Sequence, residues 1–152
     1  MQTGDSAPDF TAPTHDGSLL TLSALRGAPV VVYFYPKDDT PGCTTEAQDF
    51  TALGAAFAEA GARVIGVSKD TVAKHGKFAQ KHGLGVTLVS DADSDICERY
   101  GVWGEKSNYG RTYMGITRTT VLIDAEGKVA RIWPKVRVAG HAQAVLEAVR
   151  AL

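Results

Sequence analysis

Short apolar runs separated by polar, turn-forming residues recur along the chain. The clearest run covers residues 30–35, which are all β-branched or aromatic, with Pro29 before them and Pro36 after them. A run of this length bounded by proline is typical of a strand that is buried on both faces of a sheet. Similar patterns predict further strands at residues 63–68, 86–90, 118–123 and 128–133.

Between these runs, apolar residues recur at the three- and four-residue intervals of a helix. Such spacing from Cys43 to about residue 60 predicts one helix immediately after the first buried strand. Further helices are predicted at residues 70–82, closed by Gly83, at residues 93–100, stopped by Gly101, and from Gly140 onward. Turn-forming residues at 15–18 predict a small hairpin near the N-terminus, and those at 124–127 join the last two strands.

The order of these elements indicates the fold class. Strands and helices alternate in the first half, which favours parallel strands joined by right-handed crossovers, whereas the late hairpin adds an antiparallel edge. We therefore predict an α/β protein with a thioredoxin-like fold, in which helices flank a central mixed β-sheet and a β-hairpin lies at the N-terminus. The length of 152 residues is typical of one domain, so residues 1–152 are expected to form a single domain.

Composition and charge exclude several classes of protein. The chain has 16 Lys and Arg against 17 Asp and Glu, so no basic surface is available to hold nucleic acid or an anionic membrane. No apolar run approaches the roughly 18 to 20 residues of a membrane span, and the first residues lack the pattern of a secretory signal. The expected location is the cytoplasm. With only two cysteines, Cys43 and Cys97, a disulfide-rich scaffold is excluded.

The loop that ends at Cys43 favours a reactive thiol. Thr40 is a good N-cap and Pro41 suits the first helical position, so Cys43 would lie in the first turn of the helix. Unpaired amides and the positive end of the helix dipole favour a thiolate there. Gly42 allows a close approach to the backbone beside the sulfur. The alternative is an ordinary capped helix whose first turn happens to contain a cysteine.

The stretch from Tyr33 to Glu46 resembles the active-site loop of peroxiredoxins, most closely the bacterioferritin comigratory protein or PrxQ subfamily. The family motif of Pro, three residues, Thr or Ser, two residues and Cys is met by Pro36, Thr40 and Cys43. Residues 113–118 resemble the segment that carries the family's active-site arginine, here Arg118. Residues 7–10 and 102–106 are also similar to the subfamily, so the resemblance covers nearly the whole chain.

The resemblance implies a thiol-dependent peroxidase for hydrogen peroxide and small organic hydroperoxides. Cys43 would attack the peroxide and become a sulfenic acid. Thr40 and Arg118 would offer hydrogen bonds to the peroxide oxygens, and Pro36 would shield the pocket. Glu46 would either position Arg118 or complement the start of the helix. Thioredoxin or another thiol would regenerate Cys43, and no metal or other cofactor is implied.

The role of Cys97 stays open. Many members of the subfamily carry a resolving cysteine five residues after the reactive one, but this chain has Gln48 there. Cys97 is either a small buried residue, a partner thiol after local unfolding, or a site of intermolecular bonding. We favour the first, with a cycle that uses one cysteine and an external thiol. A monomer is expected, and a dimer is not excluded.

Two alternative functions are compatible with the same fold. A disulfide oxidoreductase needs Cys-x-x-Cys, but Glu46 occupies the second cysteine position. A non-enzymatic redox sensor or holdase would be oxidised once at Cys43, whereas an enzyme would turn over. His75 and His82, on one predicted helix with several lysines, are expected to be solvated.

Overall fold

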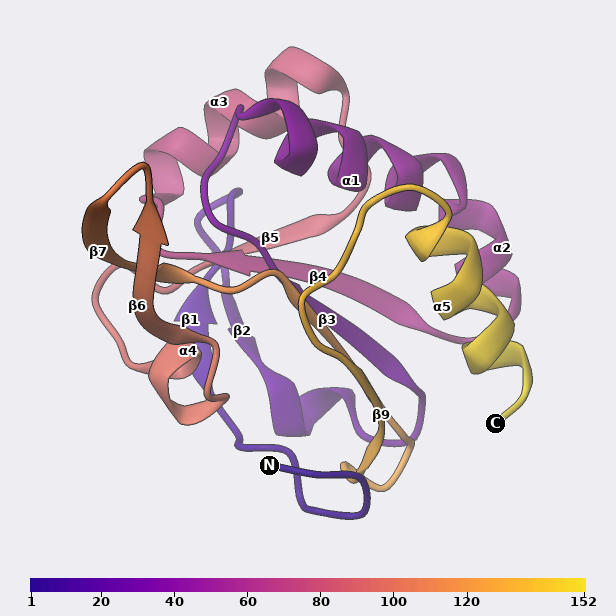
Figure 1. The fold of residues 1–152 in the computed structure, drawn as a ribbon. Helices are drawn as coiled ribbons and strands as arrows, with labels where there is room; N and C mark the ends of the chain where they lie inside the picture. Colours follow the sequence, from indigo (N-terminus) through magenta and orange to yellow (C-terminus); the bar gives the residue numbers. More distant parts are fainter.

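A five-stranded mixed sheet forms the centre of the computed structural model, which describes residues 1–152 (Figure 1). Across the sheet the strands are ordered β5 (Thr87–Ser90), β4 (Arg63–Ser68), β3 (Val30–Phe34), β8 (Thr119–Ile123) and β9 (Val129–Trp133). Strand β3 runs parallel to β4 and antiparallel to β8, and β9 is antiparallel to β8. The sheet is therefore mixed, as the order of the predicted elements indicates.

Different elements cover the two faces of this sheet. One face packs against α1 (Pro41–Ala52), α2 (Gly54–Glu59), α3 (Val72–His82) and α5 (His141–Arg150). The other packs against the N-terminal hairpin of β1 (Thr11–Pro13) and β2 (Leu19–Thr21), the 3₁₀ helix η1 (Leu22–Leu25) and α4 (Ile96–Arg99). No helix is long and apolar enough to cross a membrane.

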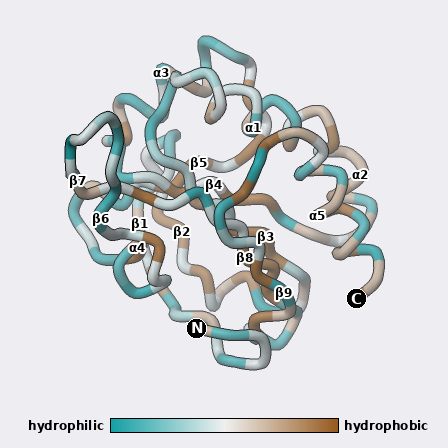
Figure 2. Tube along the Cα trace, in the orientation of Figure 1, coloured by the Kyte–Doolittle hydropathy of each residue, from teal (hydrophilic) through white to brown (hydrophobic).

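The alternation of side chains along β3 creates two separate hydrophobic cores. Val30, Val32 and Phe34 belong to a cluster of 19 buried residues on the hairpin side. Val31 and Tyr33 belong to a cluster of 17 on the side of α1 and α5. Figure 2 shows the apolar residues concentrated along the central strands between these layers. Because both faces are covered, β3 is apolar at every position.

The structure corrects two predicted elements. The single helix predicted from Cys43 to about residue 60 is divided into α1 and α2 at Leu53, which has φ −93° and ψ 7°. Gly54 follows directly, and glycine is a poor helix former. The short helix predicted at residues 93–100 contains only the four residues of α4.

An additional hairpin lies in a stretch for which the hydrophobic pattern predicts no element. Strands β6 (Trp103–Asn108) and β7 (Arg111–Ile116) pair antiparallel and form a sheet of their own. The turn places Tyr109 and Gly110 at φ 51° and φ 76°, and two successive positive φ values suit a tight hairpin. Most of these side chains are exposed or half-buried, so the hydrophobic pattern gave no signal for the strands.

Candidate active site

The loop after β3 delivers Cys43 to the start of α1. Thr40 is extended, with φ −91° and ψ 155°, and Pro41 is the first residue of the helix, as predicted. The first helical hydrogen bond runs from the Thr44 amide to the Thr40 carbonyl, at 2.9 Å. The amides of Gly42 and Cys43 precede it, at the positive end of the helix dipole.

The hydroxyl of Thr40 has a different partner from the one expected of an N-cap. It makes no capping bond to the helix. Instead, Oγ1 donates its proton to the carbonyl oxygen of Lys37 at 2.8 Å. Since a hydroxyl has one proton and two lone pairs, Oγ1 is left as an acceptor.

Arg118 reaches Cys43 from the neighbouring strand. It directly precedes β8, whose first residue Thr119 pairs with Phe34 at the end of β3. Its Nη2 donates to the Cys43 sulfur at 3.3 Å. A Cβ added to Gly42 would lie 3.2 Å from the same Nη2. The glycine thus gives the guanidinium room beside the sulfur.

Glu46 holds the other side of the same guanidinium. Nη1 of Arg118 donates to Glu46 Oε1 at 2.6 Å, and the Glu46 residue is only 1% exposed. Burial raises the pKa of Glu46 to about 7, although the charge and hydrogen bond of Arg118 oppose that rise. Arg118 is therefore fixed by two hydrogen bonds, one to a carboxylate and one to a sulfur, in a fork between Glu46 and Cys43. The planar guanidinium group suits such a paired arrangement.

The two cysteines are both buried, but they lie in different cores. Cys43 belongs to the cluster beneath α1 and Cys97 to the cluster on the opposite face of the sheet. Both are free thiols. The Cys97 amide donates to Asp91 Oδ2 at 2.9 Å. Burial, with a further contribution from Asp91, raises the pKa of the Cys97 thiol, so this sulfur keeps its proton.

His75 is buried, contrary to the sequence-based expectation of a solvated side chain, whereas His82 is half-buried. His75 is 0% exposed, and its Nδ1 lies 2.6 Å from Oδ2 of Asp38 in the loop before Cys43. His82 contacts Asp39 of the same loop through Nε2, at 2.8 Å. One signal was present in the sequence: His75 precedes the apolar Phe78 by one helical turn, on the face that packs inward.

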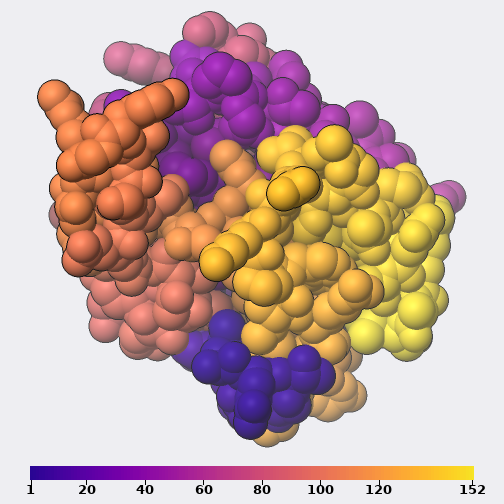
Figure 3. Space-filling model, in the orientation of Figure 1, coloured from indigo at the N-terminus to yellow at the C-terminus, as the bar shows by residue number.

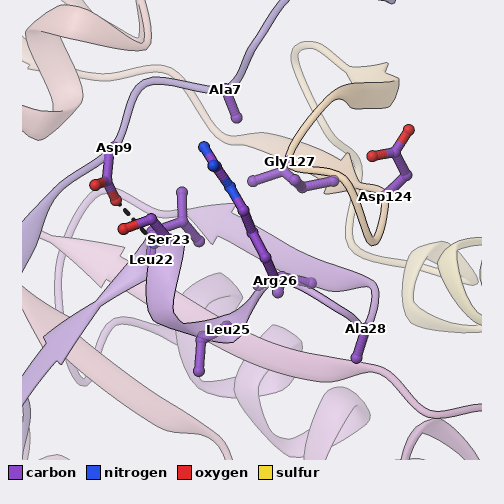
Figure 4. Close-up of a pocket in the computed structure, with 11 residues that line it drawn as sticks. Ala7, Asp9, Leu22, Ser23, Leu25, Arg26, Ala28, Asp124 and Gly127 are labelled. Atoms are coloured by element: carbon purple, nitrogen blue, oxygen red, sulfur yellow. Dashed lines mark hydrogen bonds between the residues drawn. The ribbon is translucent and has the colours of Figure 1, made fainter.

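Two further surface features differ in their relation to Cys43. The pocket in Figure 4 is lined by residues such as Leu22 of η1 and Val30, which is the first residue of β3. The loop that leads to Cys43 leaves the opposite end of β3. Arg26 reaches across it, and a Cβ at Gly127 would lie 2.7 Å from Arg26 Nε. In the view of Figure 3, a hollow lies between the β6–β7 hairpin and the yellow C-terminal part of the chain, with α1 along its upper edge.

Comparisons with known proteins identify similar chains. The AhpC/TSA family model matches residues 3–132. A putative peroxiredoxin Bcp of Coxiella burnetii is 49% identical over 146 residues, covering 96% of this chain and 97% of the relative. Peroxiredoxin Bcp of Bacillus subtilis is 45% identical over 150 residues, covering 99% and 96%.

Solved structures give the same result. The bacterioferritin comigratory protein of Xanthomonas campestris, studied for its alkyl peroxide reduction activity, superposes with a TM-score of 0.89 at 47% identity. That match covers 93% of this chain and 90% of the other. A PrxQ mutant of Xylella fastidiosa superposes with a TM-score of 0.94 at 37% identity, covering 99% and 96%.

Proposed function

Because the chain belongs to the AhpC/TSA family, as a peroxiredoxin of the Bcp or PrxQ type, we propose that Cys43 is the thiol with which it reduces peroxides. The protein is a thiol-dependent peroxidase, and what remains to assign is the part each residue plays. The observation that carries the assignment is the fork of Arg118 between Cys43 and Glu46.

The first step is nucleophilic displacement at oxygen. The Cys43 thiolate attacks the oxygen that carries the hydrogen of the hydroperoxide, and the O–O bond breaks. The attacked oxygen stays on sulfur as a sulfenic acid. The other oxygen leaves with the bonding electron pair as hydroxide or alkoxide and takes a proton from solvent. We extend the substrates to alkyl hydroperoxides, since the Xanthomonas relative reduces alkyl peroxides.

The surrounding residues stabilise charge that moves from sulfur to oxygen. Arg118 already donates to the sulfur, and the same guanidinium would donate to the departing oxygen. Thr40 Oγ1, whose proton is committed to the Lys37 carbonyl, would accept a hydrogen bond from the hydroperoxide O–H and orient it. Pro36 has no amide proton to donate, and by resemblance to the family it would shield the pocket. Glu46 positions Arg118.

Regeneration of Cys43 requires an external thiol in this scheme. Cys97 lies in the core on the far side of the sheet, so a bond between the two sulfurs would require large unfolding. A reductant thiol therefore condenses with the sulfenic acid and releases water, and a second thiol frees Cys43. Thioredoxin in a reducing cytoplasm would supply both thiols, and a monomer of one domain is sufficient for the reaction.

The test is peroxide consumption with dithiothreitol or thioredoxin as the donor. We expect Cys43→Ser to abolish turnover, because a hydroxyl is not ionised near neutrality, and Cys97→Ser to retain most of it. Mass spectrometry of wild-type protein should locate the oxidation on Cys43. Full turnover by Cys43→Ser would overturn the assignment, and a single oxidation without turnover would indicate a redox sensor or holdase.

A further inference from the structure

A buried chain of hydrogen bonds lies beneath the loop that precedes Cys43. Tyr35 donates its hydroxyl proton to Asp38 Oδ1 at 2.6 Å. Asp38 Oδ2 lies 2.6 Å from His75 Nδ1, and His75 Nε2 lies 3.0 Å from the carbonyl oxygen of Val89. Tyr35, Asp38 and His75 are 1%, 8% and 0% exposed. These hydrogen bonds link the loop to α3 and β5.

The protons of this chain can be assigned from its partners. A carbonyl oxygen only accepts, so the hydrogen bond to Val89 requires a proton on His75 Nε2. Asp38 Oδ1 already accepts from Tyr35, and burial raises the pKa of Tyr35 so that its hydroxyl stays protonated. One more proton lies between His75 Nδ1 and Asp38 Oδ2. The pair is therefore neutral as a whole, which reduces the cost of burying it.

The same aspartate fixes the backbone of the loop. The Asp38 amide donates to Asp70 Oδ2 at 2.9 Å, and Asp70 Oδ2 also accepts from Ser68 Oγ at 2.6 Å. Asp39 follows with φ 60°, a conformation that non-glycine residues adopt only when their surroundings enforce it. Thr40 comes next, so the placement of Asp38 decides where its hydroxyl lies.

A metal ion is not needed to explain this cluster. Asp38, Asp70 and His75 present ligand-type atoms within 4.8 Å of one another. Both oxygens of Asp38 and both nitrogens of His75 already have protein partners at hydrogen-bond distance. The cluster is thus organised as a hydrogen-bonded support.

We propose that His75 is a positioning residue for peroxide reduction: through Asp38 it holds the loop so that Thr40 and Cys43 face the same peroxide. This inference rests on the proposed function of Cys43. It assigns to α3 a part in the active site, because that helix lies along the loop (Figure 1). His75 acts only through Asp38 and touches neither the sulfur nor the substrate.

Two substitutions of His75 separate this role from simple packing. The amide nitrogen of His75→Asn falls near the position of Nδ1 and can still donate to Asp38. That of His75→Gln falls near Nε2 and can still donate to Val89. Each variant keeps one of the two hydrogen bonds of His75. If His75 only connects α3 to β5, Gln should be the better replacement, because it keeps the bond to Val89. If His75 holds Asp38, Asn should be the better replacement, because it keeps the bond to Asp38.

The measurement compares two reactions of the same sulfur in a single turnover. Oxidation of Cys43 by hydrogen peroxide needs the oriented loop, whereas alkylation of Cys43 by iodoacetamide needs only an accessible thiolate. We expect His75→Gln to lower the peroxide rate by about 10-fold or more, as a displaced reacting group does, without lowering the alkylation rate. His75→Asn should retain most of the peroxide rate.

Matched controls are available on the same helix. His82→Gln and His82→Asn disturb the more exposed contact with Asp39 and an edge-to-face contact with Phe78, and both should leave the peroxide rate near the wild-type value. Should His75→Gln fail to fold, Tyr35→Phe removes a single hydroxyl from Asp38 and should lower the peroxide rate to a smaller extent.

The inference is overturned if folded His75→Gln reacts with peroxide at the wild-type rate. It is also overturned if His75→Asn and His75→Gln lower the peroxide rate equally. If His75→Gln does not fold, a wild-type peroxide rate in Tyr35→Phe overturns it. The proposed function itself fails if peroxide oxidises a residue other than Cys43 in the wild-type protein. The two failures are therefore distinguishable.

Discussion

The surroundings of Cys43 and Cys97 contain the same groups in a different order. Each sulfur is buried, and each has a carboxylate and a cation nearby. At Cys43 the cation Arg118 contacts the sulfur, and the carboxylate of Glu46 lies behind it. At Cys97 the carboxylate of Asp91 is the neighbour, and the cation Lys69 lies behind that, 3.1 Å from Asp91.

In the proposed mechanism, the order of these charges distinguishes the two thiols. A cation in contact with sulfur favours the thiolate, whereas a neighbouring carboxylate and burial favour the neutral thiol. The helix at Cys43 has twelve residues and that at Cys97 has four, so their dipoles also differ in strength. Burial is common to both cysteines, so the proposed reactivity of Cys43 rests on its neighbours.

The largest effect should come from removing the cation that contacts the Cys43 sulfur. Arg118→Met is expected to lower kcat/KM for peroxide by about 10²–10³-fold, the usual loss when one donor to a developing charge is removed. Lys69→Met removes the corresponding cation near Cys97 and should leave kcat/KM unchanged. Steady-state kinetics with a thiol donor checks both, and equal losses in the two variants would contradict the comparison.

The two carboxylates should give opposite dependences of stability on pH. Burial raises the pKa of Glu46 from 4.5 to about 7, so the folded state binds more protons than the unfolded state between these values. The free energy of unfolding then falls as pH rises from 4.5 through about 7. Urea denaturation at a series of pH values should show this loss, and Glu46→Gln should remove it.

Asp91 supplies the matched control. Burial would raise its pKa, but hydrogen bonds from Ser94 and from the amides of Cys97 and Ile96 outweigh that effect and lower the pKa below 3.8. Its contribution to the free energy of unfolding is present above 3.8 and is lost as pH falls through the folded pKa. Asp91→Asn should therefore flatten the acid side of the profile and leave the region between 4.5 and 7 unchanged.

Local features of the active site could be predicted from the sequence, but its long-range contacts could not. The strand at residues 30–35 and the start of the helix at Pro41 are signalled by proline and hydrophobic pattern, and both are observed. Arg118 lies 75 residues from Cys43. Only the resemblance to peroxiredoxins indicated that contact, because no periodicity encodes the pairing of β8 with β3.

The buried cluster was missed for a different physical reason. His75 lies on a helix rich in lysine, where composition predicts a solvated face. Asp38 and Asp39 look like ordinary turn residues of a loop. Their pairing with α3 depends on how the helix packs over β5, which is a tertiary property, and the hydrophobic pattern reports only that Phe78 and Ala79 face the core.

The smallest effect tests how closely Arg118 must approach Cys43. Gly42→Ala would place a Cβ 3.2 Å from Nη2 of Arg118, so the guanidinium must shift by a few tenths of an ångström, and we expect a loss of about 2- to 5-fold in kcat/KM, well below that of Arg118→Met. Gly54→Ala is the control, since nothing lies within 4 Å of the added atom at the start of α2. It should leave kcat/KM unchanged and raise the free energy of unfolding by about 0.4–1 kcal/mol. Equal kcat/KM values for the two variants would show that Cys43 does not need the close approach of Arg118. The contrast with Cys97 would then rest on the helix dipole.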